Sequence, residues 1–371
     1  MDTSDPHIVF DNNGFCNHCT QALWRIKQRD PEKDKSKLIS LVEKIRSYPS
    51  PEGYHCVIGV SGGVDSSFLA YILKREFGLN PLAVHLDNGW NSKEAVKNIK
   101  NLVKKLDIDL HTHVIDWEEF KSMQLAYLKA SVVDIEVLTD HAIVALFFNT
   151  ASEKKIPFIV TGINPFTENI LPKSWAFNKN DLTNMKDILK KNGNIHIKTL
   201  PLLGEFRFKQ LKRNIEIVDL YEFYDFDLSH ARQILMDELG WIPYGDNHFE
   251  SIWTRFYQGY LLPRKFGFDK KKAHLSNQIC LGEVTREEAL DQLKNSKYTD
   301  ELISEDKAFV AKKFDISEEE LDRMIQSPPV SHFKYRTDFK SILLKKVMVP
   351  TNPIYKIYKR LVKSHSFGRN V

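Results

Sequence analysis

The order of apolar and polar residues along the chain predicts strands and helices in alternation. Short apolar runs with β-branched residues, typical of buried strands, lie at 56–60, 81–86, 110–115 and 156–161. Stretches with apolar residues at helical spacing lie between them, at 68–73, 93–106, 117–130 and 139–154. This alternation favours a doubly wound, mostly parallel sheet with helices on both faces, so the predicted fold class is α/β.

The residues on either side of this central region have a different character. Helical patterns outside it lie at 31–47, 231–240, 316–326 and 355–363. The segment 211–224 has a strand-like pattern, whereas 170–200 has no strong periodicity and is expected to form a loop or short helices over the functional site. The chain is therefore divided into an N-terminal knuckle and helix, an α/β domain and a mainly helical C-terminal region with a basic tail, at 1–50, 51–225 and 226–371.

Composition indicates an ordinary globular enzyme. The chain has 371 residues, of which 42% are hydrophobic, enough for a substantial core. No apolar run approaches the roughly 18 residues of a membrane helix, and the acidic, polar N-terminus is unlike a signal peptide. We therefore expect a cytoplasmic protein without a transmembrane segment.

Charge is distributed unevenly along the chain. Residues 334–371 contain ten Lys or Arg and the single acid Asp338, a net charge of +9. Because the whole chain carries +4, the first 333 residues carry −5. This balance disfavours nucleic acid as a partner of the main body and assigns the basicity to the tail.

The turn after the first predicted strand is the strongest candidate for chemistry. Backbone N–H groups at the start of the following helix point outward, glycines allow a close approach, and the helix dipole favours negative charge there. The sequence therefore predicts an anion site formed by Ser61, Gly62, Gly63, Val64, Asp65, Ser66 and Ser67.

This loop differs from the kinase-type phosphate loop, which requires a lysine after its second glycine. It has no lysine, and it carries Asp65 where that positive charge would be expected. The pattern Ser-Gly-Gly-x-Asp-Ser resembles the pyrophosphate loop (PP-loop) of the ATP pyrophosphatases, which split ATP into AMP and pyrophosphate to activate a carbonyl-type oxygen. The resemblance implies an adenine nucleotide alpha hydrolase-like fold that binds ATP.

Polar turns follow two other predicted strands at the same edge of the sheet, where α/β sheets bind ligands. Asp87 opens an Asp-Asn-Gly turn, and Gly162 and Asn164 belong to a Thr-Gly-x-Asn turn. We expect these three residues to approach the nucleotide, and Glu168 to hold a metal ion or a substrate group. The alternative for both turns is a solvated loop.

Two later stretches combine charge with aromatic residues. Residues 241–257 join several aromatic side chains with Glu250 and Arg255, which either face a ligand or lie outside a helix that packs on the sheet. Four lysines within eight residues, including Lys265 and Lys270, suit the phosphates of a ligand. The alternative for this basic cluster is a solvated face.

The cysteines suggest a metal site that the sequence does not complete. Cys16 and Cys19 form a Cys-x-x-Cys pair, half of the four ligands of a structural zinc site. Cys280 is too distant in the sequence to assign, and Cys56 falls in a predicted buried strand. Either Cys16 and Cys19 bind zinc, or they form a reduced turn at the surface.

Several motifs together resemble the N-acetyl sugar amidotransferases of the PP-loop superfamily, over roughly residues 1–300. The motifs are Asp-Thr-Ser-Asp-Pro at 2–6, Phe-Asp-x-x-Gly-x-Cys-Asn-His-Cys at 10–19, the loop at 61–67, the turns at 87–89 and 161–164, Thr-Glu at 167–168, Phe-Gly-Phe-Asp-Lys at 266–270, Ala-His-Leu-Ser at 273–276 and Thr-Arg-Glu at 285–287. Members often carry another Cys-x-x-Cys just before the first motif, and small polar residues where this chain has Cys280 and Leu281. These departures put zinc binding in doubt, but they do not affect the prediction of ATP binding.

The resemblance implies that the N-acetyl group of a nucleotide-activated sugar is converted to an acetamidino group, for bacterial surface polysaccharide such as O-antigen. ATP with Mg²⁺ would adenylylate the amide oxygen, and ammonia would displace AMP. Catalytic roles would fall to Ser61, Asp65, Glu168 and Lys173, with Asp65 also positioning Mg²⁺. ATP contacts would come from residues 61–67 with Asp87, Gly162 and Asn164, and substrate contacts from Glu250, Arg255, Lys265 and Lys270.

The source of ammonia is expected to be a separate protein. None of the four cysteines has the context of a glutaminase nucleophile, which needs a histidine and an acid beside it. The resemblance implies a partner similar to the glutaminase and cyclase subunits of imidazole glycerol phosphate synthase. Two other functions stay open at this point, namely a PP-loop enzyme that modifies tRNA, for example by thiolation, and a non-catalytic nucleotide-binding scaffold.

Overall fold

The computed structural model describes residues 1–245 and 249–338, so the helix predicted at 355–363 lies outside the described residues. The described residues form a five-stranded sheet of order β3-β2-β1-β4-β5 in which all neighbours are parallel. Its strands are β1 Cys56–Gly59, β2 Pro81–Asp87, β3 Leu110–Val114, β4 Phe158–Thr161 and β5 Glu216–Asp219. The predicted α/β class and doubly wound parallel sheet are confirmed.

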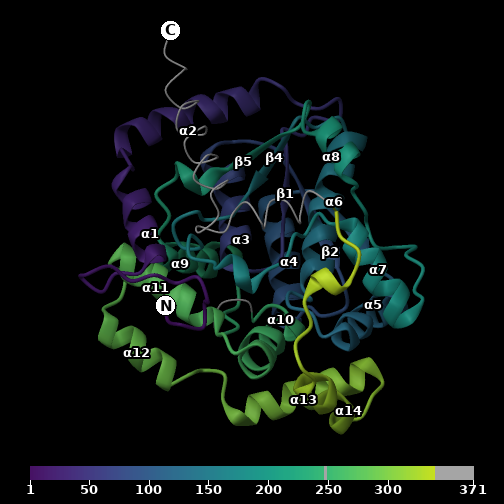
Figure 1. The fold of residues 1–371 in the computed structure, drawn as a ribbon. Coiled ribbons are helices and arrows are strands. Elements are labelled where there is room, and N and C mark those ends of the chain that lie inside the picture. The colour runs from purple at the N-terminus through teal and green to yellow at the C-terminus, as the bar shows by residue number, and fades with distance from the viewer. Residues whose placement is uncertain (246–248, 339–371) are drawn as a thin grey trace.

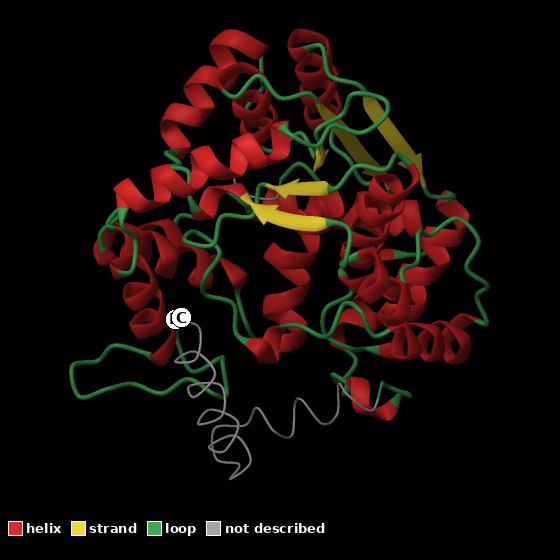
Figure 2. Cartoon of the chain, turned by 90° about the horizontal axis from the view of Figure 1, so that it is seen from above, coloured by secondary structure: helices red, strands yellow, loops and turns green. Residues whose placement is uncertain are grey.

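Helices cover both faces of this sheet because successive strand residues point to opposite sides (Figure 2). Ile58 of β1 packs with helices α2, α3, α4 and α9, whereas its neighbour Val57 packs with α6 and α8 on the other face. These helices are α2 Pro31–Arg46, α3 Val64–Tyr71, α4 Lys93–Leu106, α6 Val137–Glu153, α8 Glu205–Leu211 and α9 Leu228–Leu239. Such two-sided burial explains why the strands are apolar runs.

The helices of the C-terminal part gather on one side of the sheet, opposite α2 (Figure 1). Their bounds are α10 Ile252–Phe256, α11 Lys270–Leu281, α12 Arg286–Lys294, α13 Asp300–Phe314 and α14 Glu318–Gln326, with a π-helical segment Tyr257–Phe266 after α10. Residues of α10, α13 and α14 share one hydrophobic cluster with α5 (Trp117–Ala130) and α7 (Leu182–Gly193). The C-terminal part is therefore packed against the α/β region through a common core.

A short backbone contact joins the C-terminal part to the end of β2. Asn91 and Ser251 form an antiparallel bridge, the Ser92 N–H donates to the Glu250 carbonyl over 2.8 Å, and the Ile252 N–H donates to the Trp90 carbonyl over 3.0 Å. Residue 250, distant in sequence, is thereby fixed beside the carboxyl edge of the sheet.

Two segments with weaker patterns have a defined structure. The strand-like pattern at 211–224 contains the short strand β5, followed by the 3-10 helix Leu220–Glu222. The segment 170–200 contains the 3-10 helix Lys173–Trp175 and α7, which packs against α5, while Lys179 of the same segment lines the cavity described below. The N-terminal segment leads to α1 (Asn17–Lys27), and Phe10 and Cys16 form a bridge before it.

No helix among the described residues has both the length and the apolar character that a membrane span requires.

Candidate active site

The loop between β1 and α3 has the geometry of an anion site. Gly63 is the N-cap of α3 and has no side chain to cap it, so the first turn of the helix lacks the usual acceptor from its N-cap residue. Gly62 has φ +82°, and a Cβ there would lie 2.5 Å from the Ala95 carbonyl oxygen of α4. Glycine is therefore required at Gly62 both by its backbone angle and by the close approach of α4.

Serine side chains brace the inside of this loop. The Ser61 N–H donates to Ser66 Oγ over 3.2 Å, and the two hydroxyl oxygens lie 3.2 Å apart. The Gly63 N–H donates to Ser61 Oγ, also over 3.2 Å. The loop is thus closed upon itself and keeps its shape through its own side chains.

Two residues outside the predicted motifs hold the loop from behind. Trp241 Nε1 donates to the Gly62 carbonyl over 2.9 Å, and Asn98 Nδ2 donates to the same oxygen over 3.3 Å. Asn98 also donates to the Ile242 carbonyl and accepts from the Ile242 N–H, over 2.9 and 2.7 Å. The segment after α9 is therefore tied to the loop at 61–67, called the phosphate loop below, through the buried side-chain amide of Asn98. Neither residue carries a sequence signal of this role.

A cavity of about 1060 Å³ opens beside the loop. It lies at the carboxyl ends of β1, β4 and β5, where the strand order reverses and open α/β sheets bind ligands. One wall is apolar and comes from α6, with Ile143, Val144 and Phe147. The polar lining consists of Ser61, Asp65, Ser66, Asp140, Thr161, Thr167, Glu168, Lys179, Asp219, Arg232, Tyr244, Glu250, His274, Gln278, Glu283 and Lys297.

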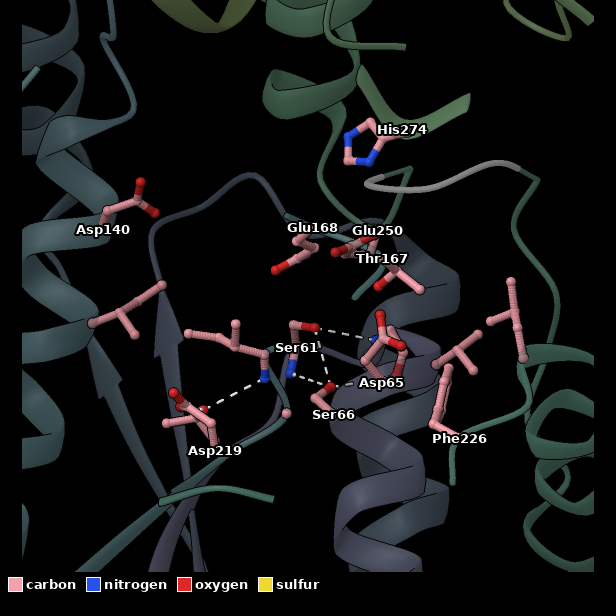
Figure 3. Close-up of a pocket in the computed structure, with 18 of the residues that line it drawn as sticks. Ser61, Asp65, Ser66, Asp140, Thr167, Glu168, Asp219, Phe226, Glu250 and His274 are labelled. Atoms are coloured by element: carbon pink, nitrogen blue, oxygen red, sulfur yellow. Dashed lines mark hydrogen bonds between the residues drawn. The ribbon is translucent and has the colours of Figure 1, made fainter. Parts of the chain in front are cut away.

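Carboxylates converge above the loop (Figure 3). Asp65 lies at the start of α3, while Glu168 and Glu250 approach from separate segments, and His274 lies further from the loop. Burial, followed by the negative charges of Glu250 and Asp65, raises the pKa of the Tyr244 phenol, so these groups are electrostatic neighbours. The Tyr244 hydroxyl also accepts a hydrogen bond from the Val64 N–H, and it lies 3.2 Å from the position of a Cβ at Gly63.

A cluster of charged residues, half-buried at Lys179 and Asp140 and buried at Asp134, borders the cavity on the side of α6. Lys179 forms an ion pair with Asp140, and both line the cavity. Burial acts to lower the pKa of Lys179, but the charges of Asp140 and Asp134 outweigh it and raise that pKa. Burial raises the pKa of Asp134 to about 6, although it accepts a hydrogen bond from the Phe177 N–H over 2.9 Å.

The structure brings about half of the predicted site residues to the cavity wall. These are Ser61, Gly63, Val64, Asp65, Ser66, Gly162, Glu168 and Glu250. A Cβ at Gly162 would lie 3.3 Å from the Asp65 carbonyl oxygen, so the turn after β4 passes close to the start of α3. Gly62 forms the back of the loop, as described above, and Ser67 is 1% exposed inside α3.

Three predicted residues lie off the cavity wall near the sheet. Asp87 accepts from the Gly89 N–H over 2.9 Å and closes the turn after β2. Asn164 accepts from the N–H groups of Phe166 and Thr167, over 2.9 and 3.3 Å, and so shapes the turn that carries Glu168. Lys173 begins the 3-10 helix Lys173–Trp175 and does not line the cavity.

The three basic residues expected to contact substrate have partners within the protein. Arg255 makes a bidentate ion pair with Asp306, with Nε and Nη2 distances of 2.8 and 2.6 Å. Lys265 is buried, and its ammonium donates to the carbonyls of Met324 and Ser327 at the end of α14, over 2.7 and 2.8 Å. Lys270 lies 3.4 Å from a Glu136 carboxylate oxygen, off the cavity wall. All three charges are thus engaged by other protein groups, and none of the three residues lines the cavity.

The cysteine pair has a neighbour that the sequence did not identify. Cys16 Sγ donates to Cys19 Sγ over 3.3 Å, and the Cys19 thiol in turn interacts with that of Cys280. The hydrogen bond from Cys19 lowers the pKa of Cys280. Among the described residues, however, no group of three His, Cys, Asp or Glu side chains is arranged to hold a metal ion. The zinc prediction for Cys16 and Cys19 therefore gains a nearby thiol but no complete ligand set.

Two known families match separate parts of the chain. Residues 38–168 match the NAD synthase family, and residues 250–348 match the family described as LPS biosynthesis protein WbpG-like, C-terminal domain. The first segment contains the phosphate loop, and the second contains Glu250 and His274. The two matched segments thus supply different walls of one cavity.

Comparison with curated proteins gives one long match and one short match. The chain is 25% identical over 295 residues to an uncharacterized protein of Methanocaldococcus jannaschii, covering 77% of this chain and 89% of that protein. It is 30% identical over 108 residues to the glutamine-hydrolyzing GMP synthase of Pyrobaculum aerophilum, covering 29% of this chain and 19% of the synthase. The chain therefore spans only about a fifth of that second relative.

Solved structures of similar proteins resemble the chain weakly. The NH3-dependent NAD synthetase of Campylobacter jejuni is 14% identical with a TM-score of 0.35, covering 81% of this chain and 99% of the synthetase. The U34-tRNA thiolase of Methanococcus maripaludis is 15% identical with a TM-score of 0.30, covering 71% of this chain and 82% of the thiolase. Likenesses at this level do not discriminate between functions.

Proposed function

We propose, from the premise that this is an ATP-using enzyme of the PP-loop superfamily, that the chain is an amidotransferase. It converts the N-acetyl group of a nucleotide-activated sugar to an acetamidino group, for bacterial surface polysaccharide of the O-antigen type. One observation carries the proposal: a single cavity joins the loop of the NAD synthase-like segment to side chains of the WbpG-like segment. Nucleotide and acceptor would meet there.

The proposed reaction has two steps. The acetamide oxygen attacks the α-phosphorus of ATP, and the bond to the leaving pyrophosphate breaks with its electron pair on the pyrophosphate oxygen. Ammonia then attacks the imidate carbon, and AMP departs with the former amide oxygen. Adenylylation is needed because an unmodified amide oxygen is a poor leaving group.

The loop residues fit the pyrophosphate half of ATP. Ser61, Gly63 and Ser66 present hydroxyl and N–H groups at the start of α3, where the helix dipole favours an anion. Mg²⁺, when bound, would supply positive charge to the leaving pyrophosphate, and Asp65 and Glu250 are the carboxylates suited to hold it. Glu168 lies above the loop and would position the acceptor amide or ammonia.

Ammonia is proposed to come from a separate glutaminase and cyclase-like partner complex in the cytoplasm. Within the described ranges, none of Cys16, Cys19, Cys56 and Cys280 lines the cavity, so no thiol nucleophile stands beside the nucleotide site. The same observation weighs against tRNA thiolation of the kind that uses a persulfide-carrying cysteine at that site.

The test is a reconstituted reaction followed by mass spectrometry. The purified chain is incubated with ATP, Mg²⁺, an ammonium salt and a UDP-N-acetyl sugar, and AMP, pyrophosphate and the mass of the sugar nucleotide are measured. We expect stoichiometric AMP and pyrophosphate, and a sugar product in which an NH group replaces an oxygen atom. Pyrophosphate release that needs no sugar, or that only tRNA stimulates, would contradict the proposal.

A matched pair of carboxylate variants tests the role of the loop. Asp65→Asn is expected to lower kcat/KM by about 10²–10³-fold, the cost typical of losing one group that stabilises transition-state charge. Glu32→Gln is the control, because Glu32 also lies in the first turn of a helix, α2, but is exposed and outside the cavity. Equal activity of the two variants would remove Asp65 from the mechanism.

A further inference from the structure

Arg232 is a cavity residue that no predicted motif contains. It lies on α9, lines the cavity beside the phosphate loop, and is partly buried. Among the described residues, its Nε is buried without a hydrogen-bond partner. A buried donor of this kind costs free energy, and at a cavity wall a bound ligand can satisfy it.

The surroundings of Arg232 place it on the loop side of the cavity. Helix α9 packs against α3, the helix that begins at the loop. The positive charge of Arg232 acts to lower the pKa of the Tyr244 phenol, whereas the negative charge of Asp65 acts to raise it. The Tyr244 hydroxyl also accepts a hydrogen bond from the Val64 N–H. Arg232 therefore belongs with the residues around the start of α3.

The other cations of the cavity are engaged or exposed. Lys179 is paired with Asp140 on the side of α6, and Lys297 is exposed. The loop itself has no lysine, and it carries a carboxylate at Asp65. Arg232 is consequently the cavity cation, within the described residues, that combines burial with a donor left over for a ligand.

We infer that Arg232 binds the β- and γ-phosphates of ATP from the side of α9 and stabilises the departing pyrophosphate. This inference rests on the proposed function, because it assumes that the cavity takes ATP. A guanidinium suits the role, since its planar donors match phosphate oxygens and remain protonated. When the bond from the α-phosphorus to the bridging oxygen breaks, the electron pair moves onto the pyrophosphate, and Arg232 meets that charge with N–H groups without giving up a proton.

The test compares three ligands on two arginine variants. Binding of ATP, pyrophosphate and AMP, each with Mg²⁺, is measured by calorimetry on the full chain and on Arg232→Met. We expect the variant to bind ATP and pyrophosphate about 10- to 100-fold more weakly, as for the loss of charged hydrogen bonds, and AMP within about twofold. The control is Arg264→Met, which removes an exposed arginine that stacks on Tyr260 outside the cavity, and which should leave all three affinities unchanged.

Thermal unfolding separates a ligand role from a structural one. Without ligand, Arg232→Met should unfold at the same temperature as the original chain or higher, because an unsatisfied donor has been removed. ATP should then raise the melting temperature of the original chain more than that of the variant. Arg232→Lys keeps the charge but not the fork of donors, and is expected to recover part of the pyrophosphate affinity; it also serves if the methionine variant does not fold.

The outcomes distinguish this inference from the proposed function. If the original chain binds neither ATP nor pyrophosphate, the proposed function fails together with the inference. If the original chain binds both and Arg232→Met binds them equally well, or loses AMP to the same extent, the inference alone is wrong. Partial recovery of pyrophosphate affinity in Arg232→Lys supports the inference, whereas a folded lysine variant that still binds AMP but binds pyrophosphate no better than Arg232→Met contradicts it.

Discussion

Gly62 shows how closely single residues determine the phosphate loop. Its φ of +82° is a left-handed conformation that side chains rarely adopt, and a Cβ would meet the backbone of Ala95. Ser61 and Ser66 act from the inner side of the loop through their hydroxyls. The shape of the loop therefore depends both on the missing Cβ of Gly62 and on the hydroxyls of Ser61 and Ser66.

The glycine argument predicts the result of Gly62→Ala. The substitution should destabilise the protein by more than the roughly 1–2 kcal/mol of a left-handed alanine, because α4 must also move away. Gly53→Ala is the matched control, since Gly53 has φ +85° with nothing near its Cβ position. Denaturant unfolding and ATP titration should show a larger stability loss, and a loss of ATP affinity, only for Gly62→Ala. Equal effects of the two variants would contradict the proposed contact with α4.

Asp134 predicts a pH dependence of stability. Burial raises its pKa from 3.8 to about 6 in the folded protein, so the folded state holds the proton more tightly than the unfolded state. This group therefore makes stability fall as pH rises from about 4 to 6, by about 2–3 kcal/mol. Asp134→Asn keeps an acceptor for the Phe177 N–H but removes the charge, so its unfolding free energy relative to the original chain should rise by that amount between pH 4 and 6.5. A difference independent of pH would show that Asp134 titrates normally.

At the scale of elements, the phosphate loop is held by the connection that follows α9. Trp241 and Asn98 both donate to the Gly62 carbonyl, and Asn98 also pairs with the backbone of Ile242. The Gly62 carbonyl and the Gly63 N–H belong to the same peptide group, so these hydrogen bonds also set the direction of the Gly63 N–H. An element outside the family motif thus orients a donor within it.

Trp241→Phe tests this connection by removing the indole donor while keeping an aromatic ring. The loss of one hydrogen bond, about 0.5–1.5 kcal/mol, predicts a KM for ATP several-fold higher and a smaller change in kcat. Trp253→Phe is the control, because Trp253 is also buried but its Nε1 has no partner among the described residues and lies off the cavity wall. Both variants should lose packing energy, and only Trp241→Phe should change the KM. An ATP effect shared by both would indicate general loosening of the core.

At the scale of the whole molecule, the cavity depends on segments that are distant in the chain. The start of α3 provides Asp65, the turn after β4 provides Glu168, and Glu250 is delivered by backbone pairing next to β2. The C-terminal helices are fastened by buried contacts such as the Arg255 pair with Asp306. The position of Glu250 in the cavity wall therefore depends on how these helices pack against the sheet.

The parts of the site that lie within one motif were predictable. The loop at 61–67 appears in the structure as a strand, a glycine turn and a helix start, because neighbouring residues determine that conformation. Lys265 shows the opposite case, since a lysine near other lysines suggests a phosphate site, yet its ammonium is used by carbonyls of α14. Sequence position does not tell which acceptor a long, flexible side chain will reach.

The parallel α/β sheet and the conformation of the loop at 61–67 could be predicted from the sequence, because apolar periodicity and glycine conformation are local properties. The set of charged groups that line the cavity became known only from the folded protein. The sequence pointed to Arg255 and not to Arg232, yet Arg232 leaves a buried donor at the cavity wall and Arg255 is satisfied by Asp306. The physical reason is that a charge acts through the partners within a few ångströms, and folding alone chooses those partners.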